Sequence, residues 1–337
     1  MKDSDEFSIL KKVFKNLGNQ YFDSSNLLVG PGDDAGLFQT KKELIFSIDT
    51  SIENIHFPKG LNAKKIAYRS CAVAASDIAA CGGALKWLAI SLSTSSKDEN
   101  WIEDFSKGVR EFSDSYKVPI IGGDLTSGKE ISISIGVCGE IEKKYFMRRS
   151  GAQENDLLIV SGDLGAAYTG LQVLEREKAV FKVDPNSQPD LSRYSYSIER
   201  QLKPEARKDI IELLEELKIV PTSMIDISDG VSSEIFHLSK SSEVGFHIFE
   251  DKLPVDPEVN LICEEFKFNS TTAALNGGED YELLFTIAQK DFHKIKNHPF
   301  LSVIGHSVEK KAGCQLITGL GHQIELTAQG WQTFENR

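Results

Sequence analysis

Residues 118–137 read VPIIGGDLTSGKEISISIGV and contain the pattern that decides the fold class. The apolar run at 118–121 is typical of a short buried strand, and it leads directly into Gly122, Gly123 and Asp124. Apolar residues at every second position from 131 to 137 then indicate a strand with one buried face. An acid in a glycine-rich turn beside an apolar element is the arrangement that recurs along the chain.

Helices and strands alternate on both sides of this stretch. Apolar spacing predicts helices at 4–18, 62–80, 99–116, 164–177, 204–217 and 232–241, and strands at 43–49, 85–92, 157–161, 245–249, 282–287 and 301–304. Pro204 fits the first turn of its helix, where no amide hydrogen is needed. Mixed elements in both halves of the 337 residues predict an α/β (α+β) fold of two domains. The periodicity lapses at RRSGAQEN, so we expect domains at 1–147 and 148–337.

The composition is that of an ordinary globular protein, with 40% hydrophobic and 26% charged residues and a net charge of −12. This charge would repel nucleic acid and anionic membranes, so neither is expected as a partner. No window reaches the ~18 uncharged apolar residues of a membrane helix. The acidic beginning MKDSDEF differs from a signal peptide, which predicts a cytoplasmic protein. The five cysteines form no CxxC pair and are expected to be reduced packing residues.

Six acidic segments share one setting, in which an apolar strand or a small-residue helix meets a turn. They are Gly32-Asp33-Asp34, Ser47-Ile48-Asp49-Thr50, Ala75-Ser76-Asp77, Gly122-Gly123-Asp124, Asp226-Ile227-Ser228-Asp229-Gly230 and Gly277-Gly278-Glu279-Asp280. Clustered carboxylates need compensating cations, and oxygen ligands favour Mg²⁺ or Ca²⁺ over zinc. Glycines beside the acids would let nucleotide phosphates approach the backbone. Any one segment alone is more often a simple turn, so the prediction rests on the set.

Several other sequence features allow both a functional and a purely structural interpretation. GDLTSGK at 123–129 fits GxxxxGK, but Glu130 stands where a P-loop needs Ser or Thr, and a strand follows instead of a helix. Arg149 fits either a phosphate contact or a solvated linker charge. His56 fits either a substrate contact or a loop residue. Trp331 and Phe334 would pack over an aromatic ligand or over the protein itself.

Taken in order, the motifs GPGDDAGLF, FSIDTSIENIHFP, AASDIAACGG, IIGGDLTSG, RRSG, DISDGVSSEI and NGGEDYELLFT resemble the thiamine-monophosphate kinase family, a branch of the aminoimidazole ribonucleotide synthetase (PurM-like) superfamily. The resemblance covers nearly the whole chain. It implies an N-terminal domain that binds ATP and metal and forms a homodimer through its sheet, a C-terminal α/β domain, and an ATP site between the two. It also implies transfer of the terminal phosphoryl group of ATP to thiamine monophosphate with several Mg²⁺ ions.

The resemblance assigns roles position by position. The implied metal ligands are Asp34, Ser47, Ile48 through its backbone, Asp49, Asp77, Asp124, Asp226 and Asp229, of which Asp124, Asp226 and Asp229 are expected to be catalytic. The implied ATP contacts are Gly123, Asp124, Arg149 and Ser228, and the implied substrate contacts are His56, Glu279 and Phe334. Ile48 departs from the family, whose members commonly carry Thr there. The motifs contain no Ser/His or Cys/His nucleophile pair, which favours direct in-line transfer.

Two other functions compete with this interpretation. One is another ATP-dependent enzyme of the superfamily, such as an aminoimidazole ribonucleotide synthetase or a selenophosphate synthetase. No cysteine precedes Cys71, whereas the selenophosphate type carries a reactive Cys or selenocysteine in an N-terminal loop. The other is a nucleotide or divalent-ion sensor without turnover, which the intact set of acids disfavours.

Overall fold

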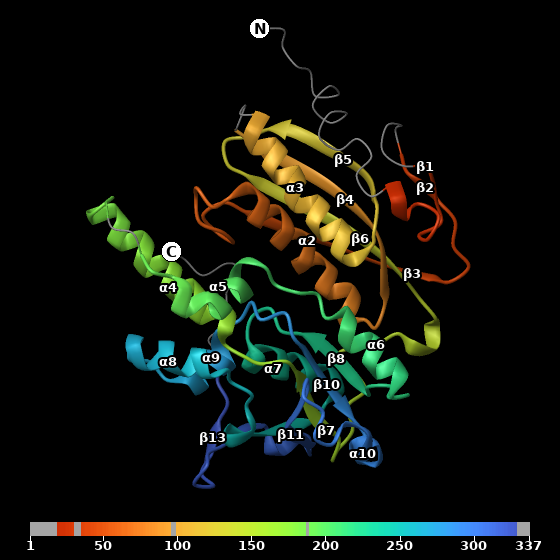
Figure 1. Ribbon diagram of the computed structural model, residues 1–337. Helices are drawn as coiled ribbons and strands as arrows, with labels where there is room; N and C mark the ends of the chain where they lie inside the picture. Colours follow the sequence, from red (N-terminus) through yellow and green to blue (C-terminus); the bar gives the residue numbers. More distant parts are fainter. Residues whose placement is uncertain (1–18, 30–34, 96–98, 187–188, 329–337) are drawn as a thin grey trace, which may run out of the picture. The chain divides into compact units, whose positions relative to one another are not determined.

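The computed structural model describes residues 19–29, 35–95, 99–186 and 189–328 (Figure 1). The chain divides into two compact units, Met1–Phe146 and Met147–Arg337, and the expected boundary lies one residue from this division. The helix expected at 4–18 lies outside the described residues. Among the described helices, none is long and apolar enough to cross a membrane.

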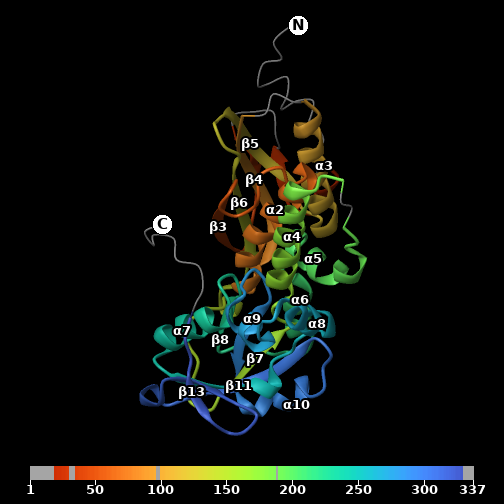
Figure 2. The same cartoon turned by 90° about the vertical axis from the view of Figure 1, so that its left-hand side faces the viewer.

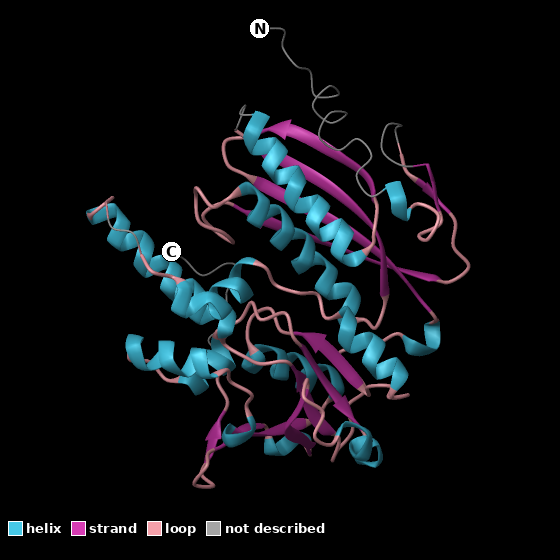
Figure 3. Cartoon of the chain, viewed as in Figure 1, coloured by secondary structure: helices cyan, strands magenta, loops and turns pink. Residues whose placement is uncertain are grey.

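The first unit contains a four-stranded sheet in the order β3-β6-β4-β5. Its strands are β3 (Glu43–Ile52), β4 (Ala84–Thr94), β5 (Ile120–Ser127) and β6 (Ser132–Ile141). β6 is antiparallel to both of its neighbours, and β4 and β5 are parallel. The helices α2 (Ala63–Ala80) and α3 (Glu99–Tyr116) run side by side over one face of this sheet (Figures 1 and 3).

Small residues allow the two helices to approach closely. α2 buries an alanine-rich surface, and Gly108 of α3 lies so near it that an added Cβ would be 2.1 Å from the carbonyl oxygen of Lys64. Phe105 and Phe112 of α3 are fully buried. The apolar stripe of α3 therefore fixes this helix layer against the sheet.

The opposite face of the sheet is covered only in part. The short strands β1 (Leu27–Val29) and β2 (Leu37–Phe38) pair with each other, and Leu27 packs in a cluster with Trp87 and Cys138. Side chains of β3 alternate between the two faces, and three on the open face are exposed: Leu44 by 44%, Phe46 by 68% and Ile48 by 60%. Three exposed apolar side chains in a row are more than a solvated strand requires.

The second unit contains a seven-stranded sheet in the order β13-β12-β9-β11-β7-β10-β8. Its strands are β7 (Leu157–Ser161), β8 (Ser223–Asp226), β9 (Gly245–Phe249), β10 (Leu283–Ile287), β11 (Leu301–Val308), β12 (Cys314–Ile317) and β13 (Gln323–Glu325). All neighbours are antiparallel except β9 and β12. The central strands β7 and β10 are almost entirely buried, as their uninterrupted apolar sequences predict.

The second unit also contains the helices that are labelled α4 to α10 in Figures 1 and 2. They are α4 (Ala166–Val183), α5 (Ser195–Leu202), α6 (Lys208–Glu216), α7 (Val231–Ser242), α8 (Pro257–Phe266), α9 (Ser270–Asn276) and α10 (Phe292–Ile295). Val231, Ile235 and Leu238 of α7 enter the main core with residues of the sheet, and α4, α8 and α9 share a second cluster.

Two sequence predictions are wrong in their local detail. The strand expected to end at 121 continues as β5 to Ser127, because Gly122 and Gly123 extend the pairing with β4 instead of forming a turn. α6 begins at Lys208 rather than Pro204, and the non-helical residues before it place the guanidinium of Arg207 against Glu282. A buried ion pair has overridden the local proline preference there.

Candidate functional site

The first unit brings together three of the predicted ligands, on β3 and α2. Alternation along β3 places Ser47 and Asp49 on the face that α2 covers, where Asp77 lies in the last turns of that helix. The hydroxyl of Ser47 donates to Oδ2 of Asp77 at 2.5 Å. Burial, and secondarily the negative charge of Asp77, raises the pKa of Asp49 to about 6. The polar groups of this cluster are therefore one hydroxyl and two carboxylates, all of which could bind a metal ion through oxygen.

Asp124 lies elsewhere in the same sheet. The register aligns Asp49, Ile135, Ile90 and Gly123 across the four strands, and Asp124 belongs to the next row with Thr50, Ser134 and Ser91. Because successive side chains point to opposite faces, Asp124 projects from the face opposite to Asp49. β3 and β5 are also the two edge strands, three strand spacings or about 14 Å apart. Within the first unit, Asp124 therefore does not join the Asp49 cluster.

Three further predicted residues of the first unit have defined places. Gly123 lies against β4, where an added Cβ would be 2.5 Å from the carbonyl oxygen of Ile90. Ile48 pairs with Gly136 of β6 and directs its side chain to the open face. His56 is exposed in the turn after β3, and its Nδ1 accepts a hydrogen bond of 3.0 Å from the amide of Ile52. Asp34, like Asp33, lies outside the described residues.

The second unit joins two of the acidic motifs through their backbones. The amide of Glu279 donates to the carbonyl of Ser228 at 2.8 Å, and that of Tyr281 donates to Ile227 at 2.9 Å. The amide of Ile227 donates in return to Glu282 at 2.8 Å. The segment 226–230 at the end of β8 and the segment 277–282 before β10 are thus joined by backbone hydrogen bonds.

Glu234 is a buried acid that the sequence analysis did not single out. Its Oε1 accepts hydrogen bonds from the amide of Asp229 at 3.1 Å and from the hydroxyl of Ser228 at 3.3 Å. Burial raises the pKa of Glu234 to about 7, and the charges of Asp226 and Asp229 act in the same direction. Its place in the first turn of α7, directly after DISDG, was the available signal.

The backbone of Arg149 lies beside the C-terminal end of α7. Its carbonyl accepts a hydrogen bond of 3.2 Å from the hydroxyl of Ser242. Burial lowers the pKa of His237, the charge of Arg149 lowers it further, and the charge of Asp229 opposes both. The charges of Arg149 and Asp229 therefore act on His237 in opposite directions.

The segment at 278–282 has an unusual backbone. Gly278 has φ of +70°, and the non-glycine residues Glu279 and Tyr281 have φ of +60° and +52°. Positive φ is costly for residues with a side chain and persists where the surroundings enforce it, which is common at functional sites. The carboxylate of Asp280, which is 1% exposed, accepts hydrogen bonds from the amides of Gly165 and Ala167 at the start of α4.

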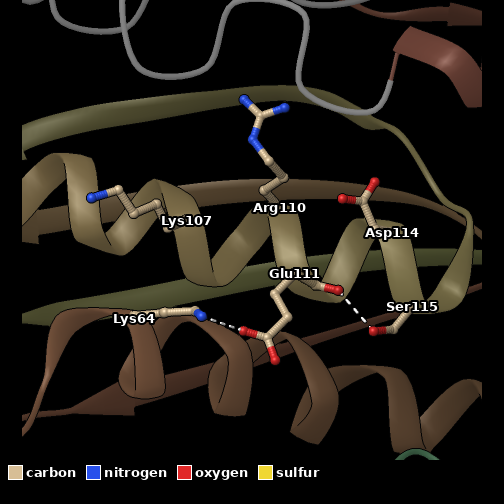
Figure 4. A pocket seen from close by; sticks show the side chains of 6 residues that line it. All are labelled: Lys64, Lys107, Arg110, Glu111, Asp114 and Ser115. Atoms are coloured by element: carbon tan, nitrogen blue, oxygen red, sulfur yellow. Dashed lines mark hydrogen bonds and ion pairs between the residues drawn. The ribbon is translucent and has the colours of Figure 1, made fainter.

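Phe334 and Trp331 lie outside the described residues. A separate hollow of about 670 Å³ lies over α2 and α3, and it contains none of the predicted site residues (Figure 4). Lys64 in its lining pairs with Glu111 at 2.8 Å. Within the described residues, no group of three or more His, Cys, Asp or Glu side chains is already arranged around a common metal position.

Comparisons with known proteins give a consistent result. Residues 32–141 match the family model "AIR synthase related protein, N-terminal domain". The chain is 35% identical over 320 residues to a thiamine-monophosphate kinase of Buchnera aphidicola subsp. Schizaphis graminum, covering 93% of this chain and 94% of that protein. It is 32% identical to a thiamine-monophosphate kinase of Aquifex aeolicus, covering 99% of each. A solved structure described as AaThiL complexed with AMPPCP and TMP is 29% identical, with a TM-score of 0.75 and coverage of 99% and 98%.

Proposed function

The chain belongs to the thiamine-monophosphate kinase family, and from that premise we propose how its residues serve the phosphorylation of thiamine monophosphate by ATP. It has the mixed α/β PurM-like fold of that family. ATP and thiamine monophosphate are its small-molecule substrates. The metal ions, the role of each residue and the oligomeric state form the proposal.

The observation that carries the metal proposal is the oxygen cluster of Ser47, Asp49 and Asp77. Two carboxylates and a hydroxyl offer the hard oxygen ligands that Mg²⁺ prefers, and a bound cation would offset the burial and the repulsion from Asp77 that raise the pKa of Asp49. When bound, Mg²⁺ would offset the charge of the transferring phosphates. Since Asp124 lies on the opposite face from this cluster, the proposed ligands would be divided among several Mg²⁺ ions; they are Asp34, Ser47, the backbone of Ile48, Asp49, Asp77, Asp124, Asp226 and Asp229.

The second unit would hold the reactants by its joined motifs. We assign Arg149 and Ser228, with Gly123 and Asp124 of the first unit, to the nucleotide. We assign Glu279, with His56 and Phe334, to thiamine monophosphate. The positive φ values around Glu279 are held in place by the hydrogen bonds to residues 226–230. Such backbone strain is common at functional sites, which supports a functional role for Glu279.

The proposed reaction is direct in-line transfer. The acceptor is a phosphate, which needs little or no base to become a nucleophile, so the residues act by alignment and charge neutralisation. Incubation with ATP labelled in its terminal phosphate, without acceptor, should leave the protein unlabelled. A stable phosphoprotein that transfers its label to thiamine monophosphate would refute direct transfer.

The metal assignment is tested with Asp77→Asn, compared with Asp104→Asn. Asp104 is a suitable control because it is on α3 of the same unit and pairs only at the surface with Lys107. Asp77→Asn should weaken Mg²⁺ binding in calorimetry and abolish formation of ADP and thiamine diphosphate, while Asp104→Asn should change neither. Native Mg²⁺ affinity in Asp77→Asn would overturn the assignment. Turnover of another acceptor, but not of thiamine monophosphate, would instead support another superfamily enzyme.

We also propose a homodimer that covers the open face of β3. Leu44, Phe46 and Ile48 form an exposed apolar row on the first unit, and burying such a row against a second copy would stabilise the association. Sedimentation at several protein concentrations should give twice the mass of the 37.3 kDa chain. A monomer at micromolar concentration would contradict this part of the proposal.

A further inference from the structure

Two consecutive side chains of α5 contact the strained segment at 279–282. Nε2 of Gln201 donates to Oε2 of Glu279 at 3.0 Å. Nη2 of Arg200 donates to the backbone carbonyl of Asp280 at 2.9 Å and to Oε1 of Glu282 at 2.7 Å. α5 lies far from this segment in the sequence and carries none of the family motifs.

Gln201 is suited to hold a carboxylate in one orientation. Its side chain is buried, with the whole residue 6% exposed, whereas Glu279 is half-buried and reaches the surface. A buried amide has few alternative orientations, so its hydrogen bond fixes one oxygen of Glu279 at little entropic cost. Arg200 at the same time holds the backbone on the C-terminal side of Glu279.

The chemistry of the donor matters as well. An arginine or lysine at 201 would neutralise the charge of Glu279, but an amide does not. Glu279 therefore keeps its negative charge toward the substrate, where it would attract the cationic thiazolium ring or accept from the amino group of thiamine monophosphate.

We propose that Gln201 is a positioning residue that aims the carboxylate of Glu279 at thiamine monophosphate. The inference rests on the proposed contact between Glu279 and this substrate. It adds a residue that the motifs do not contain, and it predicts an effect on one substrate only. The hydrogen bond of Gln201 goes to Glu279, which is assigned to thiamine monophosphate and not to ATP, so nucleotide binding should not depend on it.

The test uses Gln201→Leu, which removes the donor at similar size. Losing a hydrogen bond to a charged group should raise the KM for thiamine monophosphate about tenfold, with the KM for ATP unchanged. Calorimetry with thiamine monophosphate alone should show the same loss of affinity. Gln289→Leu, at an exposed glutamine of the same unit, is the control and should change neither constant. Equal increases in both KM values would mean that Gln201 has only a structural role, and would overturn the inference.

A double-variant cycle separates this inference from the proposed function. Glu279→Gln should itself raise the KM for thiamine monophosphate, and adding Gln201→Leu should then cost nothing further. If Glu279→Gln has no effect, the assignment of Glu279 fails. If it has its effect but Gln201→Leu alone has none, or if the two effects simply add, the positioning role fails.

Gln201→Glu provides a second variant in case the leucine variant is poorly folded. It keeps a polar side chain of the same length but places a like charge beside Glu279. It should raise the KM for thiamine monophosphate more than Gln201→Leu does. An unchanged KM in a folded Gln201→Glu protein would also overturn the inference.

Discussion

Replacing Glu282 with Gln should destabilise the second unit more than any exposed charge change. Glu282 is 1% exposed and binds two arginines, Arg200 at 2.7 Å and Arg207, as well as the hydroxyl of Ser161. The side chains of Arg200 and Arg207 are themselves only 12% and 8% exposed. An amide of the same shape removes the negative charge and turns a donor toward one guanidinium. Two buried cations then lose their shared counter-ion.

The expected cost follows from the burial. Removing one partner of a buried ion pair costs about 3–5 kcal/mol, because the remaining charge is left in a medium of low polarity. At about 2–4 °C per kcal/mol for a domain of this size class, the melting temperature should fall by about 6–20 °C. Urea unfolding followed by far-ultraviolet circular dichroism gives the free energy directly, provided that the slope with denaturant is unchanged.

Asp209→Asn is the matched control. Asp209 binds the same Arg207 at 2.7 Å, but its side chain is 59% exposed, so removing its charge should cost at most about 1 kcal/mol. If Glu282 is shielded from water and Asp209 is not, the losses of stability for the two variants must differ widely. Equal and small losses for Glu282→Gln and Asp209→Asn would show that water reaches the Arg200–Glu282–Arg207 group, and the electrostatic account of this core would be refuted.

Three further results are expected. The pKa of Asp49 is raised from 3.8 to about 6, so its contribution to the free energy of unfolding is fully present below pH 3.8 and is lost as the pH rises through 6. In urea titrations at several pH values, saturating Mg²⁺ should remove this decline in stability. An identical pH profile with and without Mg²⁺ would count against the metal site. Gly170→Ala would place a Cβ 2.1 Å from the carbonyl oxygen of Ser197, so it should lower the free energy of unfolding by about 1–3 kcal/mol. Because the clash would displace α5, the KM for thiamine monophosphate should also rise. An unfolding curve like that of the native protein would refute the close packing. Phe46→Ser should shift the proposed dimer toward monomer in sedimentation, and an unchanged dimer would exclude this face of β3 as the interface.

The elements that the sequence predicted best are those with clear apolar periodicity. The helix expected at 99–116 and the strands at 157–161 and 245–249 match α3, β7 and β9 residue for residue. Several short helices were not foreseen, among them α5 and α8. In such elements, tertiary contacts decide the backbone, and local preference is too weak to reveal them.

The candidate site likewise contains residues that could be predicted from the sequence and residues that could not. The motif residues were identifiable because the same arrangement of acids beside turns and apolar elements recurs in six segments. The face of the sheet on which Asp124 lies was not, because it depends on β5 continuing through Gly122 and Gly123. A shift of one residue in a strand reverses the face of every side chain. Gln201 and Arg200 left no local pattern at all, since their partners are about 80 residues away.

Gly278 explains why the two motifs of the second unit act together. Its φ is +70°, and a Cβ there would lie 2.8 Å from the carbonyl oxygen of Ser228 and 3.2 Å from the carbonyl carbon of Asp229. Only a residue without a side chain allows 278–282 to approach the backbone that carries these two residues. The residue proposed for the substrate, Glu279, and the proposed metal ligand Asp229 are therefore set on one hydrogen-bonded surface. Any displacement of α5 that moves Glu279 should therefore also strain the segment of Asp229, so a change in α5 would act on both of these proposed contacts.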